Sequence, residues 1–259
     1  MYKGISLFSG AGGLDIGVQE AGVKVFLSSD IDEDSIKTVK LNCPDTEALC
    51  IDVKEQSFKK FKKEKNLIIF GGPPCQPFSK NGYWVKNLNR DSASDSRNLL
   101  GEFYRSIEEA KPNGFIFENV ESMLHPTNKR SLDNFEKELK ECGYSTKLLR
   151  LNAADFGVPQ KRKRIFILGI KGKNKYIDDV EPTHFAKLKG KQLPSNQTPH
   201  QGVGKFIKPF NKEKYKEDYE VASEGTYFNE IVNVIPGRNY MSLNELGKKY
   251  KGKRWKNGT

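Results

Sequence analysis

Short apolar runs alternate with amphipathic stretches along the first 170 residues of the chain. The runs have the length of strands, and the stretches between them repeat their apolar positions with a helical period. Strands are expected at Ile5–Phe8, Lys24–Ser29, Ala48–Ile51, Leu67–Phe70, Gly114–Phe117, Thr146–Leu151 and Arg164–Ile170. Helices are expected near residues 14–21, 33–42, 54–64, 97–110 and 131–142, with Gly22 and Gly143 where two of them end. The alternation predicts the α/β class, a mostly parallel sheet with helices on both faces.

Polar segments predict how the chain is divided. Residues 79–95 are rich in Ser, Asn and Asp, and a loop of that length is typically a functional lid or disordered. After about residue 171 the periodicity gives way to Lys, Asn, Gly and Pro. We therefore expect a domain over residues 1–175, followed by a basic segment over residues 176–259.

Composition is that of a soluble globular protein, with 36% hydrophobic and 30% charged residues. The longest apolar runs are strand-sized and no secretory signal pattern begins the chain, so we expect a cytoplasmic protein without a membrane span. The four cysteines form no Cys-x-x-Cys pair and no Cys/His metal spacing. Free thiols in a reducing compartment, and no metal site, are therefore expected.

Positive charge is concentrated in the last third of the chain. The net charge is +11, and residues 171–259 contain 18 Lys and Arg against 10 Asp and Glu. Such an excess favours a polyanionic partner, although a lysine-rich soluble surface would give the same count.

A glycine-rich turn follows the first expected strand, with the sequence Phe8-Ser9-Gly10-Ala11-Gly12-Gly13-Leu14-Asp15. Amides at such a helix start can hold a carboxylate or phosphate, and glycine lets a ligand approach closely. The spacing is not that of the GxGxxG fingerprint, so the turn indicates either a nucleotide-like cofactor or simply a tight turn. Asp30 ends the second strand, where an acid can bond a ribose. Asp52 follows the third strand, where it could reach an adenine amino group or cap a helix.

A second motif follows the fourth expected strand, with the sequence Gly71-Gly72-Pro73-Pro74-Cys75-Gln76-Pro77-Phe78-Ser79. Prolines on both sides of Cys75 fix its backbone, and a thiol held rigidly at a strand end is placed to act as a nucleophile. A free cysteine has a pKa of about 8.5 and needs help from its surroundings to ionise. A buried structural cysteine is the alternative.

Two further motifs carry charge at strand ends. Glu118, in Phe117-Glu118-Asn119-Val120, could exchange a proton if a dry pocket raised its pKa, or it could be a solvated glutamate. The segment Pro159-Gln160-Lys161-Arg162-Lys163-Arg164-Ile165-Phe166 enters a strand. Alternation along that strand points Arg162 and Arg164 the same way, where buried guanidiniums would need an anionic or polar partner.

In this order and spacing, the four motifs resemble those of the cytosine-5 DNA methyltransferase family. The segments Asp95-Ser96-Arg97 with Leu100, and Asn152–Pro159, are also similar to family segments. The resemblance covers residues 1 to about 170 and implies the Rossmann-like fold of S-adenosylmethionine-dependent methyltransferases. It also implies a catalytic and cofactor-binding domain over 1–175, with 176–259 as a basic linker and the start of a target-recognition region.

The resemblance implies methyl transfer from S-adenosylmethionine to carbon 5 of cytosine in duplex DNA, with S-adenosylhomocysteine as product, in a bacterial restriction–modification setting. Cys75 would add to carbon 6 of a flipped-out base, Glu118 would bind N3, and Arg164 would contact the carbonyl oxygen. Arg162 is the fourth expected catalytic residue.

The same resemblance implies two sets of ligand contacts. Cofactor contacts are expected from Phe8, Ser9, Gly10, Ala11, Gly12, Gly13, Leu14, Asp30, Ile31, Asp52, Val53, Pro74 and Leu100. DNA contacts are expected from Gln76, Ser79, Arg97, Asn119 and Gln160. Ile31 stands where some family members have tryptophan, so one stacking contact is expected to be weaker.

A complete target-recognition domain, which family members normally have, is not recognisable in this sequence. We therefore expect a shortened chain, or one subunit of a split enzyme whose second chain supplies recognition. Three other functions fit parts of the pattern: a tRNA cytosine-5 methyltransferase, a non-catalytic nucleic-acid-binding subunit, and, on the glycine turn alone, a nicotinamide oxidoreductase. No Cys-Phe-Thr element typical of the tRNA-modifying branch is present.

Overall fold

The computed structural model describes residues 1–74, 99–187 and 192–210, and for residues 127–130 the backbone alone. The loop expected over residues 79–95 lies outside these ranges. Contacts divide the chain into two units, Met1–Gln201 and Gly202–Thr259. In the second unit the described elements are α5 (Gly204–Ile207) and the short 3-10 turn Lys208–Phe210.

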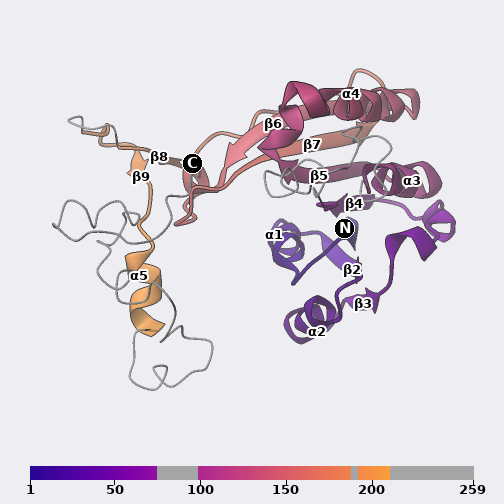
Figure 1. Ribbon diagram of the computed structural model, residues 1–259, viewed down its shortest axis with the longest axis horizontal. Helices are drawn as coiled ribbons and strands as arrows, with labels where there is room; N and C mark the ends of the chain where they lie inside the picture. The colour runs from indigo at the N-terminus through magenta and orange to yellow at the C-terminus, as the bar shows by residue number, and fades with distance from the viewer. Residues whose placement is uncertain (75–98, 188–191, 211–259) are drawn as a thin grey trace, which may run out of the picture. The chain divides into compact units, whose positions relative to one another are not determined.

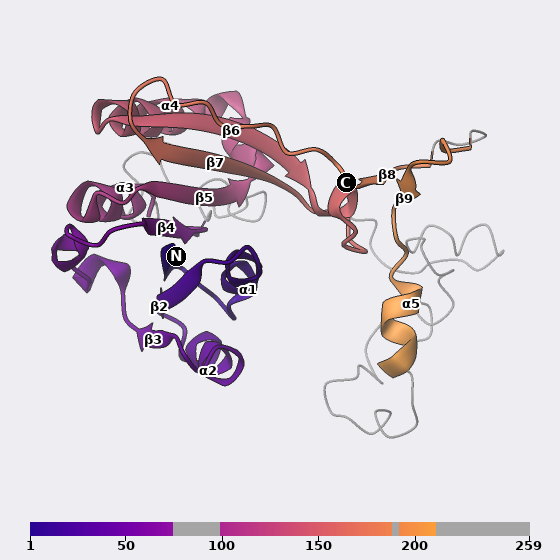
Figure 2. The ribbon, with the colours of Figure 1, turned by 180° about the vertical axis from the view of Figure 1, so that it is seen from behind.

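The first unit is built on a seven-stranded sheet with the order β3-β2-β1-β4-β5-β7-β6 (Figures 1 and 2). Its strands are β1 (Lys3–Leu7), β2 (Lys24–Asp30), β3 (Glu47–Cys50), β4 (Leu67–Gly71), β5 (Gly114–Val120), β6 (Tyr144–Asn152) and β7 (Lys163–Lys171). The first five pair in parallel, whereas β7 runs antiparallel to both β5 and β6. The predicted α/β class with a mostly parallel sheet is confirmed.

The chain reverses its direction across the sheet between β1 and β4. From β1 it moves outward to β2 and β3, then returns to the other side of β1 and continues through β4 and β5. Ligands in open α/β sheets bind outside the carboxyl ends of the strands at such a switch point. Because β7 is antiparallel, its first residues lie at the same edge, with Arg164 opposite Val120.

Helices cover both faces of the sheet. On one face, α3 (Leu100–Ala110) and α4 (Pro126–Glu141) place Phe103 and Phe135 against Phe117 of β5, with ring centroids 5.4 and 5.1 Å from it. On the other face, Val18 of α1 (Gly13–Glu20) packs with Phe70 of β4. Figures 1 and 2 show α1 and α3 on opposite sides of the strands. Alternate residues of β4 and β5 thus belong to two hydrophobic clusters, with Ile69 and Phe117 in one and Phe70 and Ile116 in the other.

All seven predicted strands and four of the five predicted helices have counterparts in the structure, but the helix expected near residues 54–64 is wrong. Two 3-10 turns, η1 (Val53–Glu55) and η2 (Lys59–Phe61), take its place. The side chain of Arg105 donates to the carbonyls of Val53 and Gln56, and Glu109 accepts from the amide of Phe58. Long-range partners therefore replace the bonds that a continuous helix would make. The helix predicted over residues 33–42 is observed with the same bounds as α2 (Glu33–Asn42).

Beyond the predicted boundary at residue 175, the described chain still contacts the sheet. Lys147 of β6 donates to the carbonyl of Ile177 at 2.8 Å and pairs with Asp179 at 2.8 Å. Further on, β8 (His184–Phe185) pairs with β9 (Thr198–Pro199). The first unit therefore extends structurally to Gln201.

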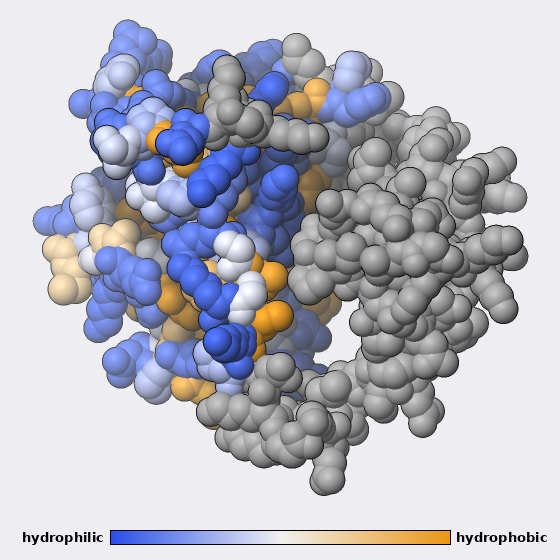
Figure 3. Space-filling view, turned by 90° about the vertical axis from the view of Figure 1, so that its left-hand side faces the viewer, coloured by the Kyte–Doolittle hydropathy of each residue, from blue (hydrophilic) through white to orange (hydrophobic). Residues whose placement is uncertain are grey.

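No helix in the described part of the chain is both long and apolar enough to cross a membrane. Figure 3 shows a face that is mostly hydrophilic with small hydrophobic patches. The mean hydropathy of −0.68 is consistent with that surface.

Two glycine variants test how tightly the sheet is packed. A methyl group at Gly169 of β7 would overlap the Phe115 ring, whereas at Gly17 of α1 it would meet no atom within 4 Å. Gly169→Ala should lower the free energy of unfolding by about 1–3 kcal/mol, and Gly17→Ala should raise it by roughly 0.5–1 kcal/mol. Urea unfolding measures both, and equal effects of the two variants would contradict the described packing.

Candidate active site

The turn after β1 has a left-handed backbone at three positions, Phe8, Gly10 and Gly12, with φ of 55°, 51° and 86°. A bulky residue in this region is unusual and strained, and such strain clusters at functional sites. Two contacts hold the turn onto β2. The amide of Ser9 donates to the carbonyl of Ser29 at 3.1 Å, and the amide of Gly10 donates to Asp30 Oδ2 at 2.8 Å.

Beneath this turn lies a fully buried carboxyl group, that of Asp15 in the first turn of α1. Its oxygens accept from the hydroxyls of Ser6 and Ser28, each at 2.5 Å. Burial raises the pKa of the Asp15 carboxyl, and the two serine hydrogen bonds oppose that rise. The carboxyl therefore ties α1 to β1 and β2 directly under the glycine turn.

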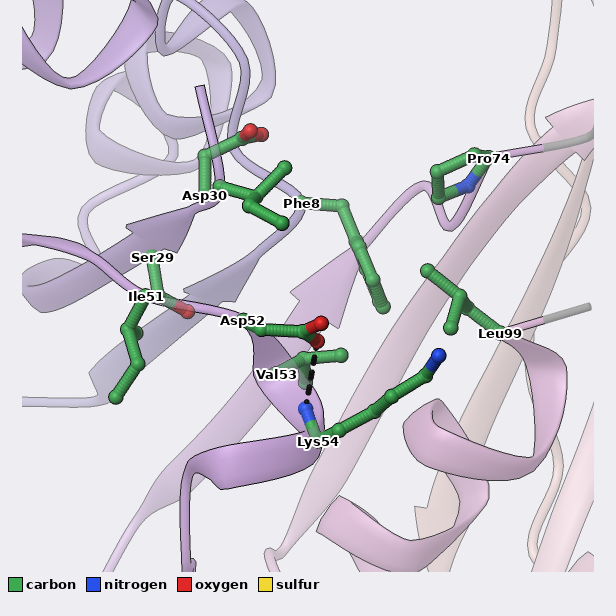
Figure 4. A pocket seen from close by; sticks show the side chains of 10 residues that line it. Phe8, Ser29, Asp30, Ile51, Asp52, Val53, Lys54, Pro74 and Leu99 are labelled. Atoms are coloured by element: carbon green, nitrogen blue, oxygen red, sulfur yellow. Dashed lines mark hydrogen bonds between the residues drawn. The ribbon is translucent and has the colours of Figure 1, made fainter. Parts of the chain in front are cut away.

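A pocket of about 380 Å³ opens beside the turn, at the carboxyl ends of β1, β2 and β3 (Figure 4). This volume lies within the range of small-molecule sites, about 300–1,000 Å³. The lining residues are Phe8, Ser29, Asp30, Ile31, Ile51, Asp52, Val53, Lys54, Pro74 and Leu99. Apolar side chains thus provide most of the wall, and two carboxylates provide polar contacts.

The two carboxylates of the pocket make their own contacts with the backbone. Asp30 accepts from the amides of Gly10 and Asp32, at 2.8 and 2.9 Å. Asp52 accepts from the amide of Lys54 at 3.0 Å, so it caps η1 and also lines the pocket. In Figure 4 the Asp52 carboxylate and the Lys54 side chain reach into the space beside Phe8 and Leu99. The predicted cap role of Asp52 is therefore observed, and its contact with an adenine amino group stays a prediction that its place in the pocket wall allows.

A second charged cluster lies at the same edge, where β5 and β7 meet. Glu118 Oε1 pairs with Arg164 Nε at 3.0 Å and with Arg162 Nη2 at 4.0 Å. Both guanidiniums contact Glu118, but only Arg164 is largely buried, with 22% of its side chain exposed, whereas Arg162 just before β7 is 51% exposed. Burial raises the pKa of the Glu118 carboxyl above its ordinary value, although the nearby Arg164 and Arg162 guanidiniums lower it. A carboxyl group held in this balance can exchange protons.

The turn before β7 fixes the start of the arginine segment. The side-chain oxygen of Asn152 accepts from the amide of Arg162 at 3.1 Å, and the amide of Ala153 donates to the Arg162 carbonyl at 3.0 Å. Asn152 also donates to Asp155, whose carboxylate contacts His200 at 2.8 Å. The amide and the carbonyl of Arg162 are therefore both hydrogen-bonded within the turn.

The segment that leads to Cys75 lies against Glu118. A Cβ added at Gly72 would be only 2.8 Å from Glu118 Oε2, so the absence of a side chain allows this approach. Asn119 is 4% exposed and donates to the carbonyl of Pro73 at 3.1 Å. Asn119 therefore joins β5 to the cysteine segment, although the sequence suggested a DNA contact for it. Gln160, another expected DNA contact, is exposed.

The structure brings six of the expected cofactor residues to the pocket wall: Phe8, Asp30, Ile31, Asp52, Val53 and Pro74. Ser9 and Gly10 lie in the turn that Asp30 holds, Ala11 and Gly13 are exposed at the start of α1, and Gly12 and Leu100 are buried. Leu14 packs on the cluster of Val18 and Phe70. Cys75, Gln76, Ser79 and Arg97 lie outside the described residues.

Four residues of the pocket wall were not predicted from the sequence: Ser29, Ile51, Lys54 and Leu99. Each is a chain neighbour of a predicted residue, and adjacency to Asp30, Asp52 and Leu100 was the signal that could have indicated them. Within the described ranges, no group of three or more His, Cys, Asp or Glu side chains is arranged to hold a metal ion.

Comparison with known proteins gives a family match along almost the whole chain. The model of the C-5 cytosine-specific DNA methylase family matches residues 2–257. The Type II methyltransferase M.AquIA of Picosynechococcus is 38% identical over 225 residues, covering 80% of this chain and 84% of that protein.

Other relatives are longer than this chain. The Type II methyltransferase M.SacI of Streptomyces achromogenes is 32% identical over 256 residues, and the match covers 92% of this chain but 64% of M.SacI. The match covers 48% of the length of M1.HphI of Haemophilus parahaemolyticus and 48% of that of M.NgoPII of Neisseria gonorrhoeae. A solved DNMT2 mutant of Spodoptera frugiperda superposes with a TM-score of 0.56 at 26% identity, covering 77% of this chain and 58% of that one.

The Glu118 cluster generates a prediction about proton affinity. Arg164→Gln should raise the Glu118 pKa further, because it removes the closer of the two positive charges that favour the carboxylate. A ¹³C NMR titration of labelled glutamate measures the change, with Lys40→Gln, an exposed position on α2, as the control. A Glu118 pKa that stays the same in Arg164→Gln would show that the pair contributes nothing to this carboxyl group.

Proposed function

This chain belongs to the C-5 cytosine-specific DNA methylase family, and on that premise we propose that it transfers a methyl group from S-adenosylmethionine to carbon 5 of cytosine in duplex DNA. One observation carries the proposal: a carboxyl group flanked by two guanidiniums lies at the strand edge that also carries the cysteine segment. Glu118 contacts Arg164 at 3.0 Å, and Gly72 approaches its other oxygen. An adenosyl-sized pocket opens at the same edge of the sheet.

Each side chain of this cluster has a part in making the cytosine ring electron-rich. The Cys75 thiolate adds to carbon 6, and the ring electrons move toward N3 and carbon 5. Glu118 in its protonated form donates to N3, and burial, which raises the Glu118 pKa, makes that form more accessible than in a solvated carboxyl group. Arg164, with Arg162 beside it, places positive charge at the ring carbonyl oxygen. After carbon 5 has taken the methyl group, loss of its proton to a base releases the Cys75 sulfur. The base must leave the duplex for these contacts to form.

The described pocket fits an adenosyl group. Phe8 would lie against the adenine, Asp52 would accept from its amino group, and Asp30 would bind the ribose hydroxyls. The amides from Ser9 to Gly13, at the start of α1, would hold the methionine carboxylate. When bound, S-adenosylmethionine supplies the methyl group that carbon 5 takes.

DNA contacts are proposed from the residues around this edge and from the basic C-terminal third. Gln76, Ser79 and Arg97 would reach the flipped base and its strand, and Gln160 would contact DNA beside the arginines. We also propose that a second chain contributes to target recognition. That arrangement predicts slow methylation by this chain alone, and full turnover by it would rule the second chain out.

Covalent trapping tests the proposed chemistry. Duplex DNA with 5-fluorocytosine, incubated with S-adenosylmethionine, should form an adduct that survives denaturation, because carbon 5 then has no proton to lose. Cys75→Ser should form none, while Cys50→Ser, a change at an exposed cysteine, should trap as the unaltered chain does. Glu118→Gln should slow adduct formation by about 10²- to 10⁴-fold, the usual effect of removing a general acid.

Three results would contradict the proposal. Adducts that persist in Cys75→Ser would place the nucleophile elsewhere. Methyl transfer to tRNA but not to duplex DNA would identify an RNA enzyme. DNA binding without any adduct, in the presence of cofactor, would favour a non-catalytic subunit.

A further inference from the structure

Two separate parts of the chain form one wall of the pocket. Leu99 precedes the first turn of α3, and Asp52, Val53 and Lys54 belong to η1 and its cap. Because η1 is a 3-10 turn of three residues, its own hydrogen bonds cannot fix its position. An interaction with the rest of the fold has to supply that constraint.

Arg105, on α3, supplies it through the backbone of η1. Its Nη2 donates to the carbonyl of Val53 at 2.7 Å, and its Nη1 donates to the carbonyl of Gln56 at 3.0 Å. One rigid guanidinium therefore spans η1 from its first residue to the residue after its end. The guanidinium also lies over the Phe58 ring, with its carbon 5.6 Å from the ring centroid.

Two carboxylates hold the guanidinium in this orientation. Glu102 accepts from Arg105 Nε at 2.8 Å, and Glu109 accepts from Nη1 at 3.2 Å. Glu109 also accepts from the amide of Phe58 at 2.7 Å, so it ties the next part of the same segment to α3. These side chains are partly buried, which strengthens the contacts relative to those of a fully exposed pair. A lysine could not reproduce this arrangement, because it lacks the planar fork of donors.

We propose that Arg105 is a positioning residue for cofactor binding, which sets the distance between Asp52 and Leu99 within this wall of the pocket. It touches no ligand and acts through Val53 and Asp52. The inference rests on the proposed function, because it assigns the pocket to the adenosyl group of S-adenosylmethionine.

A double-mutant cycle measured by binding tests the proposal without requiring methyl transfer. Isothermal titration of S-adenosylhomocysteine should show that Arg105→Ala and Asp52→Ala each raise the Kd by about tenfold, a large but ordinary loss of binding free energy for a polar contact. If Arg105 acts through Asp52, the double variant should bind only about 10- to 20-fold more weakly than the unaltered chain, because coupled residues are not additive.

Asp30, at the end of β2, supplies the contrasting cycle. Arg105→Ala combined with Asp30→Ala should weaken binding by roughly the product of the two single effects, because Asp30 is held by the glycine turn and not by η1. Glu108→Ala, an exposed change on the same helix, should leave the Kd within about twofold. Hydrogen exchange of the Lys54 and Phe58 amides should accelerate in Arg105→Ala and not in Glu108→Ala.

The outcomes separate the proposed cofactor site from the proposed role of Arg105. An unaltered chain that binds no S-adenosylhomocysteine or S-adenosylmethionine would contradict the cofactor assignment, and with it both proposals. Binding by the unaltered chain, with Arg105→Ala equally tight or with both cycles additive, would overturn the role of Arg105 alone. If Arg105→Ala does not fold, Arg105→Lys enters the same cycles, since it keeps the charge but cannot bridge the two carbonyls.

Discussion

Parallel strands that end at one edge of a sheet bring their following residues together, and the candidate site depends on this constraint. Phe8 follows β1, Asp30 ends β2, Asp52 follows β3, Gly72 follows β4, and Glu118 lies near the end of β5. The antiparallel β7 adds its first residues at the same edge. The strand arrangement therefore brings the pocket and the Glu118 cluster to one edge of the sheet, beside the reversal between β1 and β4.

The described contacts also show how local strain and buried charge are stabilised at this edge. Phe8 keeps a left-handed backbone because Ser29 and Asp30 hold the residues that follow it. Asp15 keeps a buried carboxyl beneath the turn because two serine hydroxyls donate to it. Glu118 is desolvated, which raises its pKa, and it faces two arginines, which lower it. Rigid surroundings of this kind hold reacting groups in place before a substrate arrives.

Much of this arrangement could be predicted from the sequence, because its cause is local. Strand-length apolar runs predicted the sheet, and motifs at their ends predicted Asp30, Asp52 and Glu118 as edge residues. Alternation along β7 predicted that Arg162 and Arg164 share a side. The 3-10 turns over 53–61 could not be predicted, because the backbone there is bonded to Arg105 and Glu109, about 50 residues away in sequence. Lys54 lies in the same turn, and only its adjacency to the predicted Val53 could have indicated its place in the pocket.

A crystal structure of the chain with S-adenosylhomocysteine tests the central claim most directly, that the edge pocket and the Glu118 cluster are two halves of one catalytic site. The account predicts the adenine amino group on Asp52, the ribose hydroxyls on Asp30, and the sulfur on the side of the pocket toward Glu118. Density for the adenosyl group elsewhere on the molecule, with Asp30 and Asp52 making no contact to it, would contradict the account.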